Sequence, residues 1–248
     1  MTPARDLAGS EEIADNAGSD AHAPAHQSHP RNARDRRRRG NHCRGAGVQV
    51  YMTSSHPNVV VLGGPNGAGK STAAPRLLRG TLAVDEFVNA DTLAQGLSAF
   101  RPQDVAIEAG RLTLERLDAL EHQRASFAFE STLASHGLVR RLERLRQSGY
   151  RVHVVFLWLP TVDLALARVA DRVRGGGHGV PAEDVRRRFA RGRRNFFTLY
   201  RTLAHRWRLY DASRLSAPTL VASGGEDRPT RVRLQNEWAA SAGEYGHE

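Results

Sequence analysis

The stretch VVVLGGPNGAGKST, residues 59–72, contains Lys70, the only lysine among the 36 lysine and arginine residues of the chain. It opens with an apolar, β-branched run, residues 59–62, of the kind that forms a buried strand. Glycines follow at positions 64, 67 and 69, and glycine lets a backbone turn through conformations that other residues resist. The stretch therefore predicts a strand, a tight loop and the start of a helix, in that order.

Residues 64–71 match the pattern G-x-x-x-x-G-K-[ST] of a phosphate-binding loop, or P-loop. In such a loop successive N–H groups point at the phosphates, and the helix N-terminus adds partial positive charge. We expect Lys70 to reach the β and γ phosphates of ATP and Ser71 to hold Mg²⁺. A compact ammonium fits inside the loop and a planar guanidinium does not, which explains why this position alone is lysine. The expected nucleotide contacts are Gly64, Pro65, Asn66, Gly67, Ala68, Gly69, Lys70, Ser71 and Thr72.

Composition indicates a globular, cytoplasmic protein. The chain is 40% apolar and 25% charged, and its single cysteine, Cys43, allows no internal disulfide. The longest apolar run, residues 152–159, is far shorter than a membrane helix, and the N-terminus lacks the apolar core of a signal peptide. The net charge of +10 raises the question of nucleic-acid binding. The near absence of lysine points to a bias that raises arginine everywhere, so we expect no nucleic-acid partner and no membrane partner.

The N-terminal segment differs from the rest of the chain. Residues 1–54 contain almost no aromatic or β-branched residues, and we expect a disordered basic tail. The basic run at residues 31–40 is either an arm for an acidic partner or part of a solvated tail. Met52 is an alternative translation start, which would make the tail an artefact. We expect the P-loop domain to span residues 55–248.

From residue 58 onward, short β-branched runs alternate with longer helical periods, the pattern of a parallel sheet covered by helices on both faces. The helical periods include residues 104–122 and 137–147. We therefore predict an α/β fold of the P-loop NTPase class, similar to a nucleotide kinase. The predicted strands are residues 59–62, 87–89, 126–129, 152–159, 207–210 and 219–222.

Two carboxylates follow predicted strands, and ligands of parallel sheets bind at the carboxyl ends of the strands. Asp91, in VNADTLAQGL, is placed to accept a proton from an acceptor hydroxyl or to orient it. Glu130, in FAFESTLAS, ends the third strand. The alternative is that Asp91 and Ser131 cap helices.

Residues 167–197 have the features of an arginine-rich lid. Arg168 and Arg172 share a helix face, residues 175–177 are glycines that suggest a hinge, and Pro181 starts a second helix. A further face of that helix carries Arg187, Arg191 and Arg194. Arginines of this kind stabilise charge on a phosphate during transfer. For His178 we expect a place in the loop without a catalytic role.

Together, GGPNGAGKST, NADTLAQGLS, FAFESTLAS and RVRGGGHGVPAEDVRRRFARGRRNF resemble the zeta-toxin family of P-loop kinases over residues 59–213. The resemblance implies a kinase that uses ATP and Mg²⁺ to phosphorylate the 3′-hydroxyl of the amino sugar in UDP-N-acetylglucosamine. A separate antitoxin protein is then a partner.

The resemblance also implies residue roles. Lys70 and Ser71 resemble the nucleotide and metal contacts, and Asp91 resembles the base. Glu130 and Thr132 resemble substrate contacts. Arg172 and one of three further arginines resemble the lid arginines; the three are Arg187, Arg188 and Arg191. The segment between the two carboxylates departs from the plasmid toxins and adds Glu108 and Arg111 as candidates beside the substrate.

Two alternatives stay open. The acceptor is instead an antibiotic, a simple sugar or a nucleic-acid 5′ end, in which case the P-loop chemistry is the same. Otherwise the chain is a binding switch that uses ATP without transferring phosphate, in which case Asp91 is dispensable.

Overall fold

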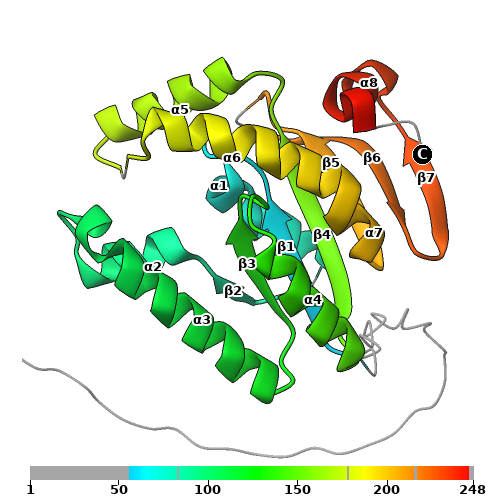
Figure 1. The fold of residues 1–248 in the computed structure, drawn as a ribbon, viewed down its shortest axis with the longest axis horizontal. Helices are drawn as coiled ribbons and strands as arrows, with labels where there is room; N and C mark the ends of the chain where they lie inside the picture. The colour runs from blue at the N-terminus through cyan, green and yellow to red at the C-terminus, as the bar shows by residue number, and fades with distance from the viewer. Residues whose placement is uncertain (1–55, 83, 178, 215–216, 246–248) are drawn as a thin grey trace, which may run out of the picture. The chain divides into compact units, whose positions relative to one another are not determined.

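Seven strands form one sheet in the order β2-β3-β1-β4-β5-β6-β7 (Figure 1). The computed structural model describes residues 56–82, 84–177, 179–214 and 217–245, which belong to one compact unit. The first five strands in this order pair in parallel, and β6 and β7 pair antiparallel. The strands are β1 Asn58–Gly63, β2 Glu86–Val88, β3 Phe127–Ser131, β4 Arg151–Trp158, β5 Arg206–Asp211, β6 Thr219–Gly225 and β7 Arg228–Val232.

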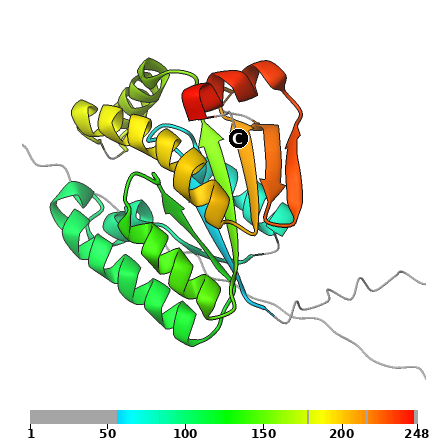
Figure 2. The same ribbon diagram turned by 45° about the vertical axis from the view of Figure 1, so that its right-hand side comes forward.

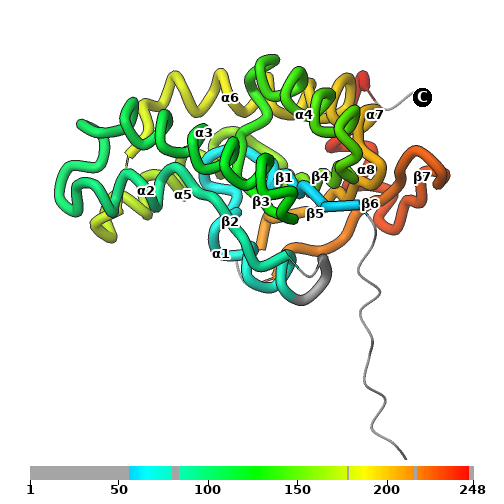
Figure 3. The backbone as a smooth tube through the Cα atoms, turned by 90° about the horizontal axis from the view of Figure 1, so that it is seen from below, coloured from blue at the N-terminus to red at the C-terminus, as the bar shows by residue number. Residues whose placement is uncertain are grey.

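Helical segments connect the strands and cover both faces of the sheet (Figure 3). The α-helices are α1 Lys70–Ala74, α2 Ala90–Leu97, α3 Ala106–His122, α4 Gly137–Gln147, α5 Val162–Arg174, α6 Ala182–Asn195, α7 Arg201–Leu203 and α8 Gln235–Ala242. The 3-10 and π-helical segments are η1 Pro75–Leu82, η2 Pro102–Val105, η3 Phe196–Tyr200 and η4 Gly243–Tyr245. No helix in these described stretches is both long enough and apolar enough to cross a membrane.

The central strand β1 shows how the sheet divides the core. Successive side chains of a strand point to opposite faces. Val59 and Val61 pack with residues of α3, α4, η3 and α8, whereas Val60 and Leu62 pack with residues of α1, η1 and α5. All four β1 side chains are fully buried, which explains why this run is apolar without alternation.

Helix α6 crosses the carboxyl end of the sheet (Figure 2). Its first turn packs Val185 into the core on the α1 and α5 side, and Phe196, just after its last residue, belongs to the core on the other side. Between them a Cβ on Gly192 would lie 2.2 Å from the carbonyl oxygen of Thr132. The Asn195 side-chain amide donates to the Leu133 carbonyl oxygen at 2.8 Å. These contacts hold α6 against the loop that follows β3.

The predicted α/β fold is confirmed, with one difference in the sheet: its β6–β7 edge is antiparallel. All six predicted strands are present, and β7 and α8 were not predicted. The prediction of a disordered tail over residues 1–54, its alternative start at Met52 and the loop position of His178 lie outside the described residues.

Candidate active site

The P-loop joins β1 to α1 and is pressed between β4 and α5. Its glycines at positions 64, 67 and 69 have φ angles of 145°, 80° and 75°. A Cβ on Gly64 would lie 2.6 Å from the Leu157 carbonyl oxygen, and one on Gly67 would lie 2.7 Å from that of Ala165. Both the backbone angles and the space therefore require glycine at positions 64 and 67.

Lys70 lies folded over this loop. Its ammonium donates to the carbonyl oxygens of Gly64, at 3.0 Å, and Pro65, at 3.1 Å. Burial lowers the pKa of Lys70, and the negative charges of Glu130 and Asp91 oppose that shift. The lysine is thus the centre of a small cluster of opposite charges.

Asn89, between β2 and α2, explains why Asp91 is available for chemistry. The Asn89 side-chain oxygen accepts from the backbone N–H groups of Asp91, at 2.8 Å, and Thr92, at 3.4 Å, so Asn89 is the N-cap of α2. Its amide donates to the Ser71 hydroxyl at 3.2 Å. Capping of α2 by Asp91, the alternative in the sequence, is therefore wrong. The Asp91 carboxylate instead lies 3.8 Å from the guanidinium of Arg172.

Glu130 ends β3 beside the P-loop. Burial raises the pKa of its carboxyl group; attraction to Lys70 and a hydrogen bond from the Ser71 hydroxyl oppose the shift. Its Oε1 atom is buried and has no hydrogen-bond partner among the described residues. The neighbouring Ser131 has a local role, because its hydroxyl accepts from the Leu133 N–H at 3.0 Å. Of these two side chains, Glu130 is the one with an unused polar atom at the site.

These groups line a pocket of about 470 Å³, here called the phosphate pocket. Its walls are residues 66–72 of the loop and α1 (apart from Ala68), Asp91 of α2, Glu130 of β3, and Arg168, Asp171 and Arg172 of α5. Lysine, hydroxyl, carboxylate and guanidinium groups from four separate elements therefore converge in one pocket. Such an arrangement can bind a polyphosphate and hold a hydroxyl group beside it.

The two arginines of α5 that line the phosphate pocket, Arg168 and Arg172, have different surroundings. Arg168 donates to the carbonyl oxygens of Ala212, at 2.8 Å, and Ser213, at 2.5 Å, with a longer contact to that of Gly67, at 3.4 Å. It ties the P-loop to the segment that follows β5. Among the described residues Arg172 has one ion pair, with Asp91 at 3.8 Å, and its side chain is 39% exposed. Arg172 is therefore the α5 arginine that is free to bind a ligand.

Among the predicted catalytic and substrate-binding residues, Arg187, Arg191, Glu108 and Thr132 do not line the phosphate pocket. Arg187 is paired with Asp184 at 2.6 Å, and Arg191 is exposed. Glu108 is exposed on α3, and Thr132 presents its carbonyl group to α6. The roles of these four residues therefore remain predictions that the lining of the pocket does not support.

One of the three candidate lid arginines and two residues that were not predicted join the site. Among the arginines of α6, Arg188 is the one whose charge contributes to the lowered pKa of Lys70; it also lies 3.5 Å from the carboxylate of Asp184. Asp171 lines the pocket and Asn89 holds Ser71. The sequence could have indicated Asn89, because it directly follows a predicted strand and asparagine is favoured at the N-cap of a helix. The position of Arg188 relative to Lys70 depends on how α6 crosses the sheet, and no local sequence pattern predicts that crossing.

Comparison with known proteins identifies relatives of the chain. Residues 59–199 match a family described as AAA domain, AAA_33. An uncharacterized protein of Haemophilus influenzae is 32% identical over 124 residues, which make up 49% of this chain and 84% of that protein.

Solved structures share the fold. A chain of the AvrRxo1-ORF1:AvrRxo1-ORF2 complex with sulphate ions matches with a TM-score of 0.60 at 18% identity, over 74% of this chain and 62% of that one. The PezAT chromosomal toxin-antitoxin system of Streptococcus pneumoniae matches with a TM-score of 0.51 at 15% identity, over 71% of this chain and 75% of that one. The chain thus spans less than two thirds of the AvrRxo1 chain that it matches. The match over residues 59–199 covers more than half of the sequence, and we conclude that this chain belongs to the AAA_33 family of AAA domains and has the fold of a P-loop kinase.

Proposed function

We propose that the chain is an ATP-dependent phosphotransferase of the zeta-toxin type, which phosphorylates a hydroxyl group of a small metabolite, UDP-N-acetylglucosamine first among the candidates. The observation that carries the proposal is the pairing of Asp91 with Arg172, at 3.8 Å, in the pocket that also contains Lys70. The binding-switch alternative gives a carboxylate at this place no role toward an acceptor hydroxyl. A kinase needs one to orient the attacking hydroxyl.

Each charged group has a role in this proposal. Lys70 leaves the carbonyl oxygens of Gly64 and Pro65 to bind the β and γ phosphates of ATP, and its N–H groups exchange one set of oxygen acceptors for another. Arg172, which lines the pocket, and Arg188, whose positive charge acts on Lys70, stabilise negative charge on the phosphate in transit. Asp91 accepts the proton of the acceptor hydroxyl.

The donor set fits a magnesium ion. Among the described residues there is no cluster of three or more His, Cys, Asp or Glu side chains suited to a metal. Mg²⁺ with a nucleotide needs no such cluster, because phosphates and water supply most of its oxygen ligands. The Ser71 hydroxyl would hold the ion, and the unpartnered Glu130 Oε1 is a further oxygen beside it. When bound, the ion neutralises charge on the β and γ phosphates.

Two observations support the choice of acceptor and partner. The four motifs that resemble zeta toxins lie on β1–α1, β2–α2, β3 and α5–α6, the elements around the phosphate pocket. The PezAT match is a toxin-antitoxin system with the same fold. We therefore propose a UDP-sugar as substrate and a separate antitoxin as partner, in the cytoplasm.

The experiment is transfer of labelled γ-phosphate from ATP to UDP-N-acetylglucosamine by the purified full chain, with the product resolved by chromatography. Lys70→Ala is the control that separates P-loop chemistry from a contaminating kinase. The proposal predicts a labelled nucleotide sugar that disappears in the variant. Label that stays in ATP or passes only to water would contradict the choice of acceptor.

A further inference from the structure

A pocket of about 400 Å³ lies on the antiparallel end of the sheet and is here called the arginine pocket. It is formed by β5, β6 and β7, which lie side by side at one edge of the sheet (Figure 1). It shares no lining residue with the phosphate pocket. Its lining includes five arginines: Arg206 and Arg208 on β5, Arg228 and Arg231 on β7, and Arg233 just after β7.

The pairing of these strands places three polar side chains in one row. Arg208 is paired with Ser223 of β6, and Ser223 is paired with Arg231 of β7. Paired residues of neighbouring strands point to the same face of a sheet, and the strands lie about 4.8 Å apart. Arg206, two residues before Arg208, points to that face as well. The floor of the pocket is therefore a hydroxyl between guanidinium groups, over a span of about 10 Å.

The positive charge of the arginine pocket is not balanced by the residues around it. No Asp or Glu is among the described residues that line it, and the two positions between β5 and β6 that the structure does not describe, Leu215 and Ser216, are uncharged. The five arginine side chains make no ion pair or hydrogen bond with another described residue. Glu226, in the turn between β6 and β7, pairs with Arg146 instead. Such a cluster of unpaired cations attracts an anion.

Arg206 gives a second, independent indication of a ligand. Its Nη1 atom is buried and has no hydrogen-bond partner among the described residues. A charged donor that loses contact with water and gains no acceptor destabilises a fold. An anion inside the pocket would supply the acceptor that this group lacks.

Protection of the sheet edge does not account for the cluster. Charged side chains and proline on an edge strand prevent pairing with other chains, and β7 carries both in Arg228, Pro229 and Arg231. Arg206 and Arg208, however, belong to β5, which lies two strands inside this edge. Edge protection therefore explains the arginines of β7 and leaves those of β5 unexplained.

The chemistry and size of the pocket favour a compact phosphate ligand. A guanidinium group binds phosphate oxygens through two charge-assisted hydrogen bonds. Proteins that bind single-stranded nucleic acid also stack its bases on aromatic side chains. The aromatic residues that line this pocket, Trp207 and Tyr210, are only 4% and 9% exposed, so neither offers a stacking surface. A volume of about 400 Å³ suits a short chain of phosphate groups better than an extended polymer.

We propose that the arginine pocket binds a compact polyphosphate, inorganic or carried by a nucleotide, at a site separate from the P-loop. Arg208 and Arg231 bind its outer phosphate groups from two sides, and the Ser223 hydroxyl donates to the group between them. Arg206 donates through Nη1 to an oxygen of the same chain. The inference does not depend on the proposed function, because none of these residues lines the phosphate pocket.

The test is an NMR titration of the full chain with inorganic triphosphate and, separately, with ATP. Backbone amide signals of Ser223 and Arg231 report binding in the arginine pocket. Those of Gly67 and Gly69 report binding at the P-loop in the same spectra. The two affinities are therefore measured separately, and failure of this site is distinguishable from failure of nucleotide binding at the P-loop.

We expect Arg208→Gln and Arg231→Gln each to weaken triphosphate binding in the arginine pocket about tenfold. Arg208→Lys should weaken it only about threefold, because the ammonium keeps the charge and loses the two-pronged hydrogen bonding. The matched control is Arg140→Gln, which removes the same charge from an exposed position of α4 outside the pocket. It should leave binding within about twofold, and P-loop binding should be unchanged in all variants.

The proposal is overturned if triphosphate leaves the signals of Ser223 and Arg231 unchanged, or if wild type, Arg208→Gln and Arg231→Gln bind it equally. Tighter binding in this pocket of a hexaglutamate peptide or of single-stranded oligouridine RNA would also overturn it, in favour of an acidic protein segment or a nucleic acid. Equal binding of ATP and triphosphate would support recognition of the phosphate chain alone. Tighter binding of ATP would support a nucleotide as its source.

Discussion

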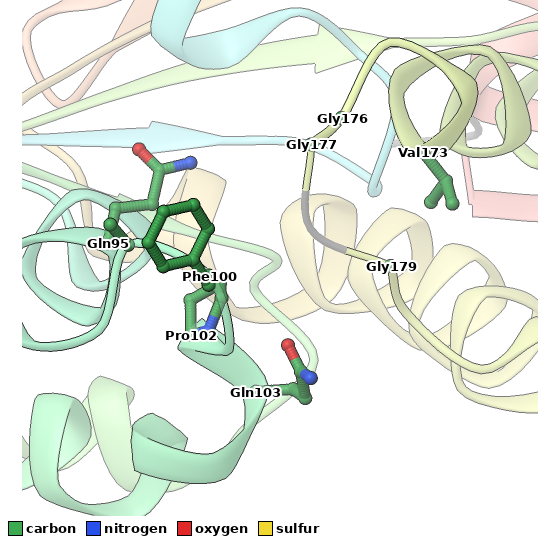
Figure 4. A pocket seen from close by; sticks show the side chains of 9 residues that line it. Gln95, Phe100, Pro102, Gln103, Val173, Gly176, Gly177 and Gly179 are labelled. Atoms are coloured by element: carbon green, nitrogen blue, oxygen red, sulfur yellow. The ribbon is translucent and has the colours of Figure 1, made fainter. Parts of the chain in front are cut away.

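Two pockets are lined by residues of both α2 and α5: the phosphate pocket, and a second pocket that is lined by Gln95 and Phe100 on one side and by Val173 on the other (Figure 4). They differ in the charge of the residues that line them. In the phosphate pocket lysine, carboxylates and arginines balance one another, and Lys70 and Ser71 already have hydrogen-bond partners. The second pocket, of about 580 Å³ and here called the outer pocket, is lined by described residues of which none is ionisable, and its Phe100 is almost fully exposed. The difference teaches that the charged groups of the fold are gathered at the P-loop, where a polyphosphate needs them, and that the neighbouring surface has none among its described lining residues.

The first prediction tests which arginine of α6 acts in the phosphate pocket. Arg188→Ala should lower phosphate transfer at least about 100-fold, because an arginine that stabilises the phosphate in transit is worth about 10³ to 10⁵ in kcat. Arg187→Ala, one position along α6, removes an arginine that is paired with Asp184 and should cost less than about twofold. Single-turnover transfer from labelled ATP measures both. Equal losses in the two variants would show that α6 is turned differently in the working enzyme.

The second prediction tests whether α6 is a fixed wall of the phosphate end. Gly192→Ala places a methyl group 2.2 Å from the Thr132 carbonyl oxygen and should destabilise the fold by about 1–3 kcal/mol. The control is Gly110→Ala within α3, where a Cβ meets nothing within 4 Å, and it should stabilise by about 0.5–1 kcal/mol. Urea unfolding gives both values. Opposite signs are expected, and a neutral Gly192→Ala would mean that α6 can move away from the β3 loop.

The smallest effect concerns the buried Glu130. Because burial raises its pKa, wild-type stability falls as the pH rises from below the ordinary value of 4.5 through the raised value. Glu130→Gln removes that loss, so the variant should have the higher Tm at pH 8, and its advantage should vanish at pH 4. Thermal unfolding at the two pH values measures the difference. A lower Tm for the variant at pH 8 would show that attraction to Lys70 outweighs burial.

The sequence predicted the fold and the phosphate end well, because both depend on local patterns. Runs of β-branched residues marked β1 and β4, and glycine spacing marked the P-loop. The strand β7, Arg228–Val232, was missed because it carries two arginines and a proline and is mostly exposed; it forms by pairing with β6. The helix α8, Gln235–Ala242, was missed as well.

The rest of the site depends on contacts between distant segments. The cap by Asn89, which frees Asp91, is a local interaction that asparagine preferences could have indicated. The approach of Arg188 to Lys70 requires the crossing of α6 over the sheet, and the outer pocket requires α2 and α5 to face each other. Neither leaves a pattern along the chain. The sequence does not distinguish Phe100 from other loop residues, and only the structure shows that its side chain is 97% exposed.

The central claim is that Asp91 serves an acceptor hydroxyl, and Asp91→Asn tests it most directly. The variant keeps the size of the side chain and the Asn89 cap but loses the proton acceptor. ATP affinity and transfer of labelled γ-phosphate to the acceptor would be measured on the same preparation. The account predicts ATP affinity within about threefold of wild type and transfer lowered about 10² to 10⁴-fold. Transfer at the wild-type rate would contradict it, and would move the site of acceptor activation away from α2.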